Sequence, residues 1–203
     1  MEHFIINYLF IKEVIFMKRF IISISVLLLM GTNAYSAKLG DVNIPDTLNA
    51  GKDKLILNGA GYRTKFYMNI YVGALYLTQK SADQNDIINA DKAMAIKMHI
   101  VSSMISSSKM INAVNAGFDN ATGGNITPIE KEIKQLLAIF QEKIEIGDEF
   151  DLVYVPGQGV LASKNGKLKG TIKGLAFKKA LFGIWLCDQP ADKYLKKSML
   201  TGN

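Results

Sequence analysis

The order of strand-like and helix-like segments restricts this chain to a mixed architecture. Strand patterns rich in Tyr, Phe, Ile and Val come first, at Lys54–Asn58, Tyr62–Tyr67, Asn69–Leu77 and Ala93–Val101. Two helical patterns follow, then three more strand patterns, and then two closing helical patterns. Strands and helices grouped in separate runs are typical of an α+β fold. We therefore expect one α+β domain built on a mainly antiparallel sheet.

The central helices are predicted from the spacing of apolar residues. Ser106–Ala121 carries such residues at helical intervals and is followed by two glycines. Thr127-Pro128-Ile129-Glu130 then indicates a second helix, in which Thr127 caps the start and Glu130 completes a capping box. The buried stripe of this second helix is expected to comprise Ile129, Ile133, Leu136, Leu137 and Phe140.

The second half of the chain begins with a strand pattern at Phe150–Val155. Val160–Ser163 and Leu168–Lys173 are then joined by Asn165-Gly166, a pair suited to the positive φ angles of a type I′ hairpin turn. The closing helices are expected at Leu175–Leu186 and Ala191–Leu200. Together with the earlier segments, these elements fit a single domain over residues 37–203.

The first 36 residues have the pattern of a secretion signal. A charged start at Met17-Lys18-Arg19 precedes the apolar run Phe20–Met30, and small residues in Ala34-Tyr35-Ser36 suit cleavage after Ser36. The apolar run is shorter than the roughly 20 residues of a comfortable membrane span. Residues 1–16 are interpreted as an over-extended start upstream of Met17, with an uncleaved N-terminal anchor as the alternative. We therefore expect an exported, periplasmic protein.

The charge of the chain excludes some classes of partner. The sequence has 24 basic and 18 acidic residues, and the lysines are dispersed rather than interleaved with aromatic residues. A nucleic-acid platform is therefore not predicted. The excess of lysine permits weak contact with anionic membrane surfaces. Cys187 is the only cysteine, so no internal disulfide can form, and nothing in the sequence predicts an oligomeric state.

No cofactor or metal site is predicted. The part of the chain after the leader has one histidine, His99, in a strand-like run, and no cysteine or histidine pair has ligand spacing. Nucleotide-binding loops and the G-x-S-x-G hydrolase motif are absent from the sequence. The acidic residues Asp148, Glu149 and Asp151 are interpreted as the polar start of a strand. No catalytic residue is assigned.

Arg63 is the most informative polar residue. It is one of two arginines in the chain, and the other, Arg19, lies in the predicted leader. Arginine holds a carboxylate through two parallel hydrogen bonds, which lysine cannot reproduce. A binding role therefore competes with a structural ion pair, for which Asp53, Asp148 or Glu149 could supply the acid.

The order of several short motifs resembles the chalcone isomerase-like family, in particular its bacterial members with a signal peptide. The resemblance covers about residues 39–200. The matching segments are Leu57–Arg63, Tyr71–Leu77, Gly147-Asp148, Tyr154–Gly157, Asn165-Gly166 and Phe177–Leu186 with Asp188 and Pro190. The resemblance implies an open-faced β-sandwich, in which a large antiparallel sheet is packed by helices and holds an apolar cleft.

The resemblance also suggests which residues form a site. Plant members of the family close a flavanone ring with an arginine, a threonine, a tyrosine and an asparagine. Arg63 matches the arginine, whereas the other positions hold Tyr71, Met110 and Gly117. Fatty-acid-binding relatives keep an arginine and a tyrosine to hold a carboxylate. Arg63 with Tyr71, or else with Tyr67 or Tyr62, fits that arrangement in residue type.

Three hypotheses for function follow. The first is a non-enzymatic, exported binder of a small apolar acid, such as a fatty acid, whose carboxylate is held by Arg63. The second is an isomerase or intramolecular lyase that acts on an unknown substrate. The third is an envelope scaffold or partner-binding protein in which Arg63 forms a structural ion pair. Fold analogy does not choose among them, because chemistry depends on the site.

Overall fold

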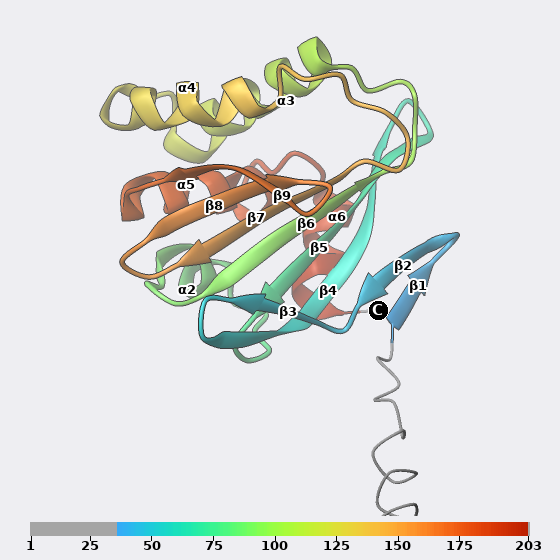
Figure 1. The fold of residues 1–203 in the computed structure, drawn as a ribbon, viewed down its shortest axis with the longest axis horizontal. Coiled ribbons are helices and arrows are strands. Elements are labelled where there is room, and N and C mark those ends of the chain that lie inside the picture. Colours follow the sequence, from blue (N-terminus) through green and yellow to red (C-terminus); the bar gives the residue numbers. More distant parts are fainter. Residues whose placement is uncertain (1–35, 203) are drawn as a thin grey trace, which may run out of the picture. The chain divides into compact units, whose positions relative to one another are not determined.

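The computed structural model describes residues 36–202 (Figure 1). The leader predicted for residues 1–36 lies outside this range, apart from Ser36, where the first strand begins. Within the described range, no helix is both long and apolar enough to cross a membrane.

A seven-stranded antiparallel sheet forms the centre of the domain. Its strands follow one another in sequence order, so each strand from β3 to β9 pairs with the next one along the chain. The strands are β3 (Thr47–Ala50), β4 (Asp53–Lys65), β5 (Met68–Leu77), β6 (Met94–Ile100), β7 (Glu149–Val155), β8 (Gly159–Lys164) and β9 (Lys167–Ile172). A separate hairpin precedes the sheet and consists of β1 (Ser36–Leu39) and β2 (Val42–Pro45).

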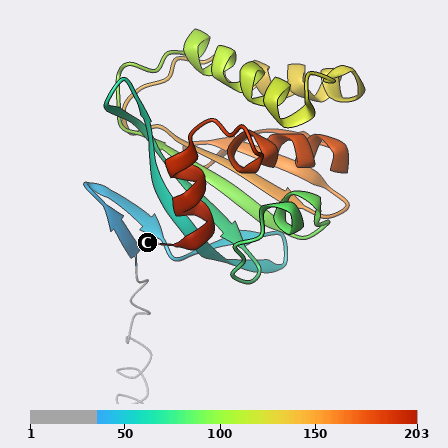
Figure 2. The same ribbon diagram turned by 180° about the vertical axis from the view of Figure 1, so that it is seen from behind.

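The helices gather on one face of the sheet (Figures 1 and 2). They are α2 (Gln84–Asn89), α3 (Ser107–Thr122), the 3₁₀ turn η1 (Thr127–Ile129), α4 (Glu130–Ile139), α5 (Leu175–Leu186) and α6 (Lys193–Thr201). Helix α6 lies on β4, α4 contacts β9, and α3 packs on α5. The predicted α+β class with a large antiparallel sheet is therefore confirmed.

Alternation along the strands separates two hydrophobic cores. On the helix face, Tyr71 and Leu75 of β5 pack among large aromatic side chains such as Phe118 and Phe177. On the opposite face, Val72 joins residues of β2 and β4 in a smaller core. Successive strand residues point to opposite faces, so the register of β4 and β5 determines which side chains can meet the helices.

Three local predictions differ from the structure. The two strands expected at Lys54–Asn58 and Tyr62–Tyr67 form the single strand β4, which continues through its glycines and ends at Lys65. The short strands β1, β2 and β3 were not predicted. Thr127 does not cap a helix, because Thr127–Ile129 forms a 3₁₀ turn without a capping side-chain hydrogen bond and α4 begins at Glu130.

The glycines of β4 allow helix α6 to approach the sheet closely. A Cβ atom placed on Gly59 would lie 2.1 Å from the carbonyl oxygen of Ser198, and one on Gly61 would lie 2.7 Å from the Ser198 side chain. The neighbouring Asn58 donates to the carbonyl oxygens of Met199 and Ser81. Asn58, Gly59 and Gly61 are therefore explained by the packing of α6 on β4. Arg63, in the same motif, is not explained by this packing.

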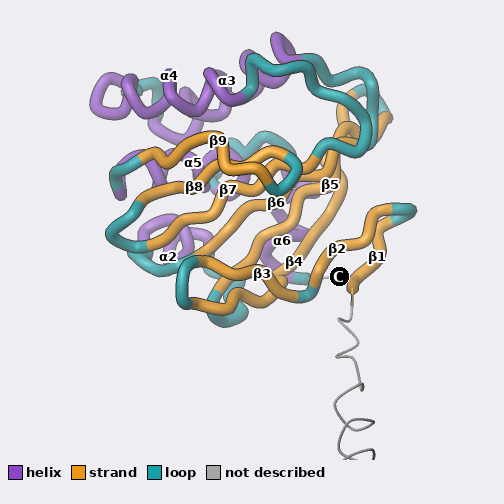
Figure 3. The backbone as a smooth tube through the Cα atoms, in the orientation of Figure 1, coloured by secondary structure: helices purple, strands orange, loops and turns teal. Residues whose placement is uncertain are grey.

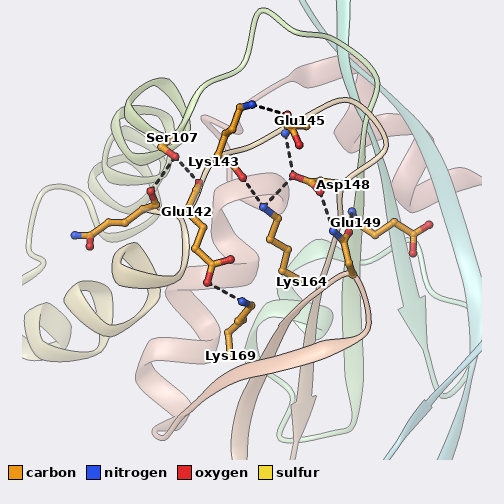
Figure 4. A network of polar contacts seen from close by, with 10 residues as sticks. Ser107, Glu142, Lys143, Glu145, Asp148, Glu149, Lys164 and Lys169 are labelled. Atoms are coloured by element: carbon orange, nitrogen blue, oxygen red, sulfur yellow. Dashed lines mark hydrogen bonds and ion pairs between the residues drawn. The ribbon is translucent and has the colours of Figure 1, made fainter.

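Figure 3 traces the backbone of helix α3 and of the β8–β9 hairpin. A polar network joins the start of this helix to the hairpin (Figure 4). Ser107 donates to the carbonyl oxygen of Glu142, and Lys164 forms an ion pair of 3.0 Å with Asp148. The Asn165 amide donates to Asp148 at 2.8 Å. Burial opposes the charge of Asp148, but these hydrogen bonds and Lys164 outweigh it and hold the pKa of this carboxyl below its usual value. The network fixes the loop 140–148 against the sheet.

Candidate functional site

A cavity of about 450 Å³ lies where the β4–β5 hairpin meets α3. It lies between strand residues such as Ile70 and helix α3, at one end of the layer in which buried side chains such as Phe118 and Phe177 pack. Three parts of the chain form its walls: the β4–β5 hairpin, the segment 104–120, and the loop before α6. Its lining residues are Arg63, Lys65, Phe66, Ile70, Met104, Ile105, Lys109, Asn112, Ala113, Ala116, Gly117, Asn120, Pro190 and Ala191.

Arg63 faces this cavity with its guanidinium unpaired by any acid of the described chain. It is partly buried, and no acidic residue between 36 and 202 lies within ion-pair distance of it. Two of the acids considered as partners are engaged elsewhere: Asp148 with Lys164, and Glu149 with Lys97. The structural ion pair that competed with a binding role for Arg63 is therefore not present among these residues.

The strand register directs Arg63 toward the helix face. Arg63 lies on the same face of β4 as Gly59 and Gly61, directly opposite Tyr71 of β5. The register shifts just after Arg63, and the backbone N–H of Thr64 donates to the carboxylate of Asp192 at 3.0 Å. This bond ties the end of β4 to the loop before α6, and both segments contribute to the cavity wall.

Tyr71 lies under Arg63 rather than on the cavity wall. The guanidinium carbon of Arg63 is 5.6 Å from the centroid of the Tyr71 ring, a distance at which a cation and an aromatic face attract each other. The Tyr71 hydroxyl accepts a hydrogen bond of 2.8 Å from Nε1 of Trp185. Burial raises the pKa of the Tyr71 phenol, although the Arg63 guanidinium opposes the shift. Tyr71 thus supports Arg63 from below and stays protonated.

The other two predicted tyrosines are not brought to the cavity. Tyr62 precedes Arg63 in β4 and therefore points to the opposite face, where it packs on the smaller core beside Gly40. Tyr67 lies in the β4–β5 turn, and its side chain is fully exposed. The four residues proposed from sequence therefore do not converge, because strand alternation and the turn separate the two tyrosines from Arg63.

Four other polar residues of the cavity wall were not predicted from the sequence. Lys65 and Lys109 bring two more positive charges to the wall, and Asn112 and Asn120 bring amides. The residues from α3 recur at intervals of three to four along one side of the helix, complementary to its apolar stripe. This spacing of small and polar residues is the one sequence pattern that could have indicated a cavity wall on α3. The wall contains three cationic residues and no acidic one.

The positions that correspond to the plant tyrosine and asparagine cannot supply acid–base groups here. Met110 is buried in the main core. Gly117 contributes to the cavity wall, but a Cβ atom at this position would lie 2.7 Å from the side chain of Ile184. Glycine at position 117 therefore allows the close packing of α3 on α5 and brings no side-chain acid or base to the cavity wall.

The acidic residues at the start of β7 lie outside the cavity. Glu149 contacts Lys97 at 2.7 Å and His99 at 3.2 Å, and Asp151 contacts Lys97 at 3.0 Å. These pairs cross between β6 and β7, as opposite charges do on neighbouring strands. No group of three or more potential ligands among the described residues could hold a metal ion.

Comparison with known proteins agrees with this architecture. Residues 36–201 match the chalcone isomerase-like family. The chain belongs to this family. Its fold is similar to the crystal structure of a fatty-acid binding protein from Arabidopsis thaliana, with a TM-score of 0.65 and 16% sequence identity. The match covers 82% of this chain and 96% of the plant protein. No curated protein matches the sequence. The family resemblance inferred from the motifs is thus confirmed.

Proposed function

We propose that this protein binds a small apolar acid, such as a fatty acid, and that Arg63 holds the carboxylate. One observation carries the proposal: the only arginine of the described chain lines a cavity and has no acidic partner among the described residues. A partly buried guanidinium without an anion is costly, and a ligand carboxylate would supply the missing charge. The proposal assigns no catalytic step to the protein.

The composition of the cavity suits such a ligand. About 450 Å³ lies within the range of roughly 300–1,000 Å³ that is usual for small-molecule sites. Ile70, Met104 and Ile105 offer apolar surface near the charged end. Each methylene that leaves water contributes about 0.8 kcal/mol, so a longer acyl chain is expected to bind more tightly until the cavity is full.

A solved structure of the same fold supports the ligand class. The plant protein compared above is a fatty-acid binding protein, and the structural match covers 96% of its chain. Because the two sequences are only 16% identical, the comparison establishes a shared fold and not a shared ligand. The assignment of the ligand class therefore depends on Arg63 and the cavity, and the plant protein serves as an independent precedent for an acid in this architecture.

Calorimetry on delipidated protein tests the proposal. A charge-assisted hydrogen bond contributes about 1.5–3 kcal/mol, so Arg63→Ala should weaken binding of a long-chain fatty acid about 10- to 150-fold. Arg63→Lys should recover only part of this loss, because lysine lacks the planar fork. Lys54→Ala removes an exposed cation from the same strand and should leave binding unchanged.

Two results would overturn the proposal. One is the absence of saturable binding to the delipidated wild-type protein. The other is equal affinity of the wild-type protein and Arg63→Ala, which would show that the guanidinium does not hold the carboxylate. The methyl ester of the same fatty acid adds a further check, because it keeps the acyl chain and should bind Arg63→Ala and the wild type equally.

We also propose that the protein is exported to the periplasm. The support is the signal-like pattern of residues 17–36, with small residues before the cleavage point after Ser36. N-terminal sequencing of protein recovered from the periplasmic fraction should begin at Ala37. Recovery of a chain that begins at Met1 or Met17 would contradict cleavage.

A further inference from the structure

The tip of the β4–β5 hairpin exposes an unusual run of apolar side chains. We call residues 65–68 the hairpin tip. Phe66 is 76% exposed, Tyr67 is 103% exposed and Met68 is 45% exposed. Lys65 and Met68 pair across the turn, so the two aromatic residues form the turn itself. Large apolar side chains that project together into solvent commonly mark a contact surface.

The backbone conformation of the hairpin tip is unfavourable for the two aromatic residues that occupy it. Phe66 and Tyr67 have φ angles of 51° and 63°, in the left-handed region that bulky residues rarely adopt. The β8–β9 hairpin of the same chain has an equivalent two-residue turn, and there Asn165 and Gly166 adopt φ angles of 52° and 73°. Asn-Gly is the favoured pair for such a turn. The aromatic pair is therefore not explained by the needs of the turn.

Positive charge surrounds the hairpin tip on the cavity side. Lys65 belongs to the tip, and its ammonium group lies 5.6 Å from the centroid of the Phe66 ring. Lys65 and Phe66 line the cavity together with Arg63 and Lys109, whereas no acidic residue does so. Exposed aromatic rings next to lysines are the combination found where proteins meet the headgroup region of a membrane.

We propose that the hairpin tip docks on an anionic lipid bilayer, with Phe66 and Tyr67 inserted at the interface and Lys65 against the headgroups. A folded protein partner fits less well, because stable protein–protein interfaces bury about 800 Å² on each side and a two-residue turn is too narrow to do so. Since Phe66 also lines the cavity, docking would turn the mouth of the cavity toward the lipid. The inference depends on the tip and holds whichever ligand the cavity takes.

Vesicle flotation with matched variants tests the proposal. The wild-type protein should float with vesicles of phosphatidylcholine and phosphatidylglycerol, and should bind vesicles of phosphatidylcholine alone more weakly. Phe66→Asn with Tyr67→Gly should reduce binding about tenfold or more, because two aromatic side chains no longer insert. Leu168→Ser is the matched control, since Leu168 is exposed beside lysines of the β8–β9 hairpin, and it should bind as the wild type does.

The outcomes separate this inference from the proposed function. Vesicle binding that survives in Phe66→Asn/Tyr67→Gly, or that falls equally in Leu168→Ser, would overturn the role of the tip. Failure of the wild-type protein to bind anionic vesicles would also overturn it. If the wild type instead forms a stoichiometric complex with a soluble protein, and the tip variant does not, the partner of the tip is a protein and the lipid proposal is wrong. Fatty-acid binding is measured separately, without vesicles, on Tyr67→Gly alone, because Phe66 lines the cavity whereas Tyr67 does not. This single variant should weaken vesicle binding and leave fatty-acid affinity unchanged.

Discussion

Replacing the aromatic pair of the hairpin tip should stabilise the protein, although the change removes two large side chains. Each left-handed non-glycine residue costs roughly 1–2 kcal/mol, and both Phe66 and Tyr67 adopt this conformation. Asn tolerates it, and Gly has no Cβ penalty but costs about 0.5–1 kcal/mol in unfolded-state entropy. The two aromatic side chains are mostly exposed, so little burial is lost. The saving of about 2–4 kcal/mol for the two residues, reduced by the cost of glycine, leaves a gain of roughly 1–3 kcal/mol for Phe66→Asn/Tyr67→Gly.

Urea denaturation followed by fluorescence measures this change. Trp185 is the only tryptophan and is buried, so its emission reports unfolding of the domain. In thermal denaturation with the same probe, a gain of roughly 1–3 kcal/mol corresponds to a rise of about 2–12 °C in Tm for a domain of this size. Gly166→Ala provides the opposite control, because nothing lies within 4 Å of its added Cβ and only the positive φ of 73° opposes it. That variant should lose about 1–2 kcal/mol.

A tip variant with an unchanged or lower urea midpoint would refute the reasoning. Such a result, combined with the expected loss in Gly166→Ala, would mean that Phe66 and Tyr67 make stabilising contacts in solution that compensate for the strained backbone. Stabilisation together with lost vesicle binding would show that the aromatic pair is retained for contact rather than for folding, which is the trade expected at a functional surface.

Three further predictions follow from the structure. Gly59→Ala should destabilise the fold by about 1–3 kcal/mol or more in urea denaturation, because its Cβ would meet backbone of α6, whereas Gly170→Ala should be nearly neutral. Asp148 has a lowered folded-state pKa, so its contribution to stability is present at neutral pH and lost as the pH falls below about 4. The loss of unfolding free energy caused by Asp148→Asn should therefore be larger at neutral pH than at about pH 2, and an equal loss at both would contradict the assignment. Tyr71→Phe should lower stability by about 0.5–1.5 kcal/mol through the lost Trp185 hydrogen bond, while calorimetry should show unchanged fatty-acid affinity.

Much of the fold was predictable from the sequence because its elements carry local signals. The alternation in Ala93–Val101 and the Asn165-Gly166 turn agree with β6 and with the β8–β9 hairpin. The break predicted between two strands at Gly59 is wrong, because glycines commonly mark turns but do not do so here. In the structure they lie inside β4, where α6 approaches too closely for a side chain.

The candidate site was predictable only in part. Arg63 stands out in the sequence because the rest of the domain uses lysine for positive charge. Its neighbours did not stand out, since Lys109 and Asn120 come from a helix that is remote in sequence from β4. The turn at Phe66-Tyr67 also gave no signal, because this pair lacks the residues that ordinarily mark a hairpin turn.

Local patterns and residue identity were enough to predict most of the helices and strands, the family, and the presence of a single arginine in the domain. Only the tertiary structure decided that Arg63 meets a cavity rather than an acid, and that Tyr71 faces the helices while Tyr62 faces away. The physical reason is that a strand's register assigns each side chain to a face, and that assignment depends on pairing between distant segments.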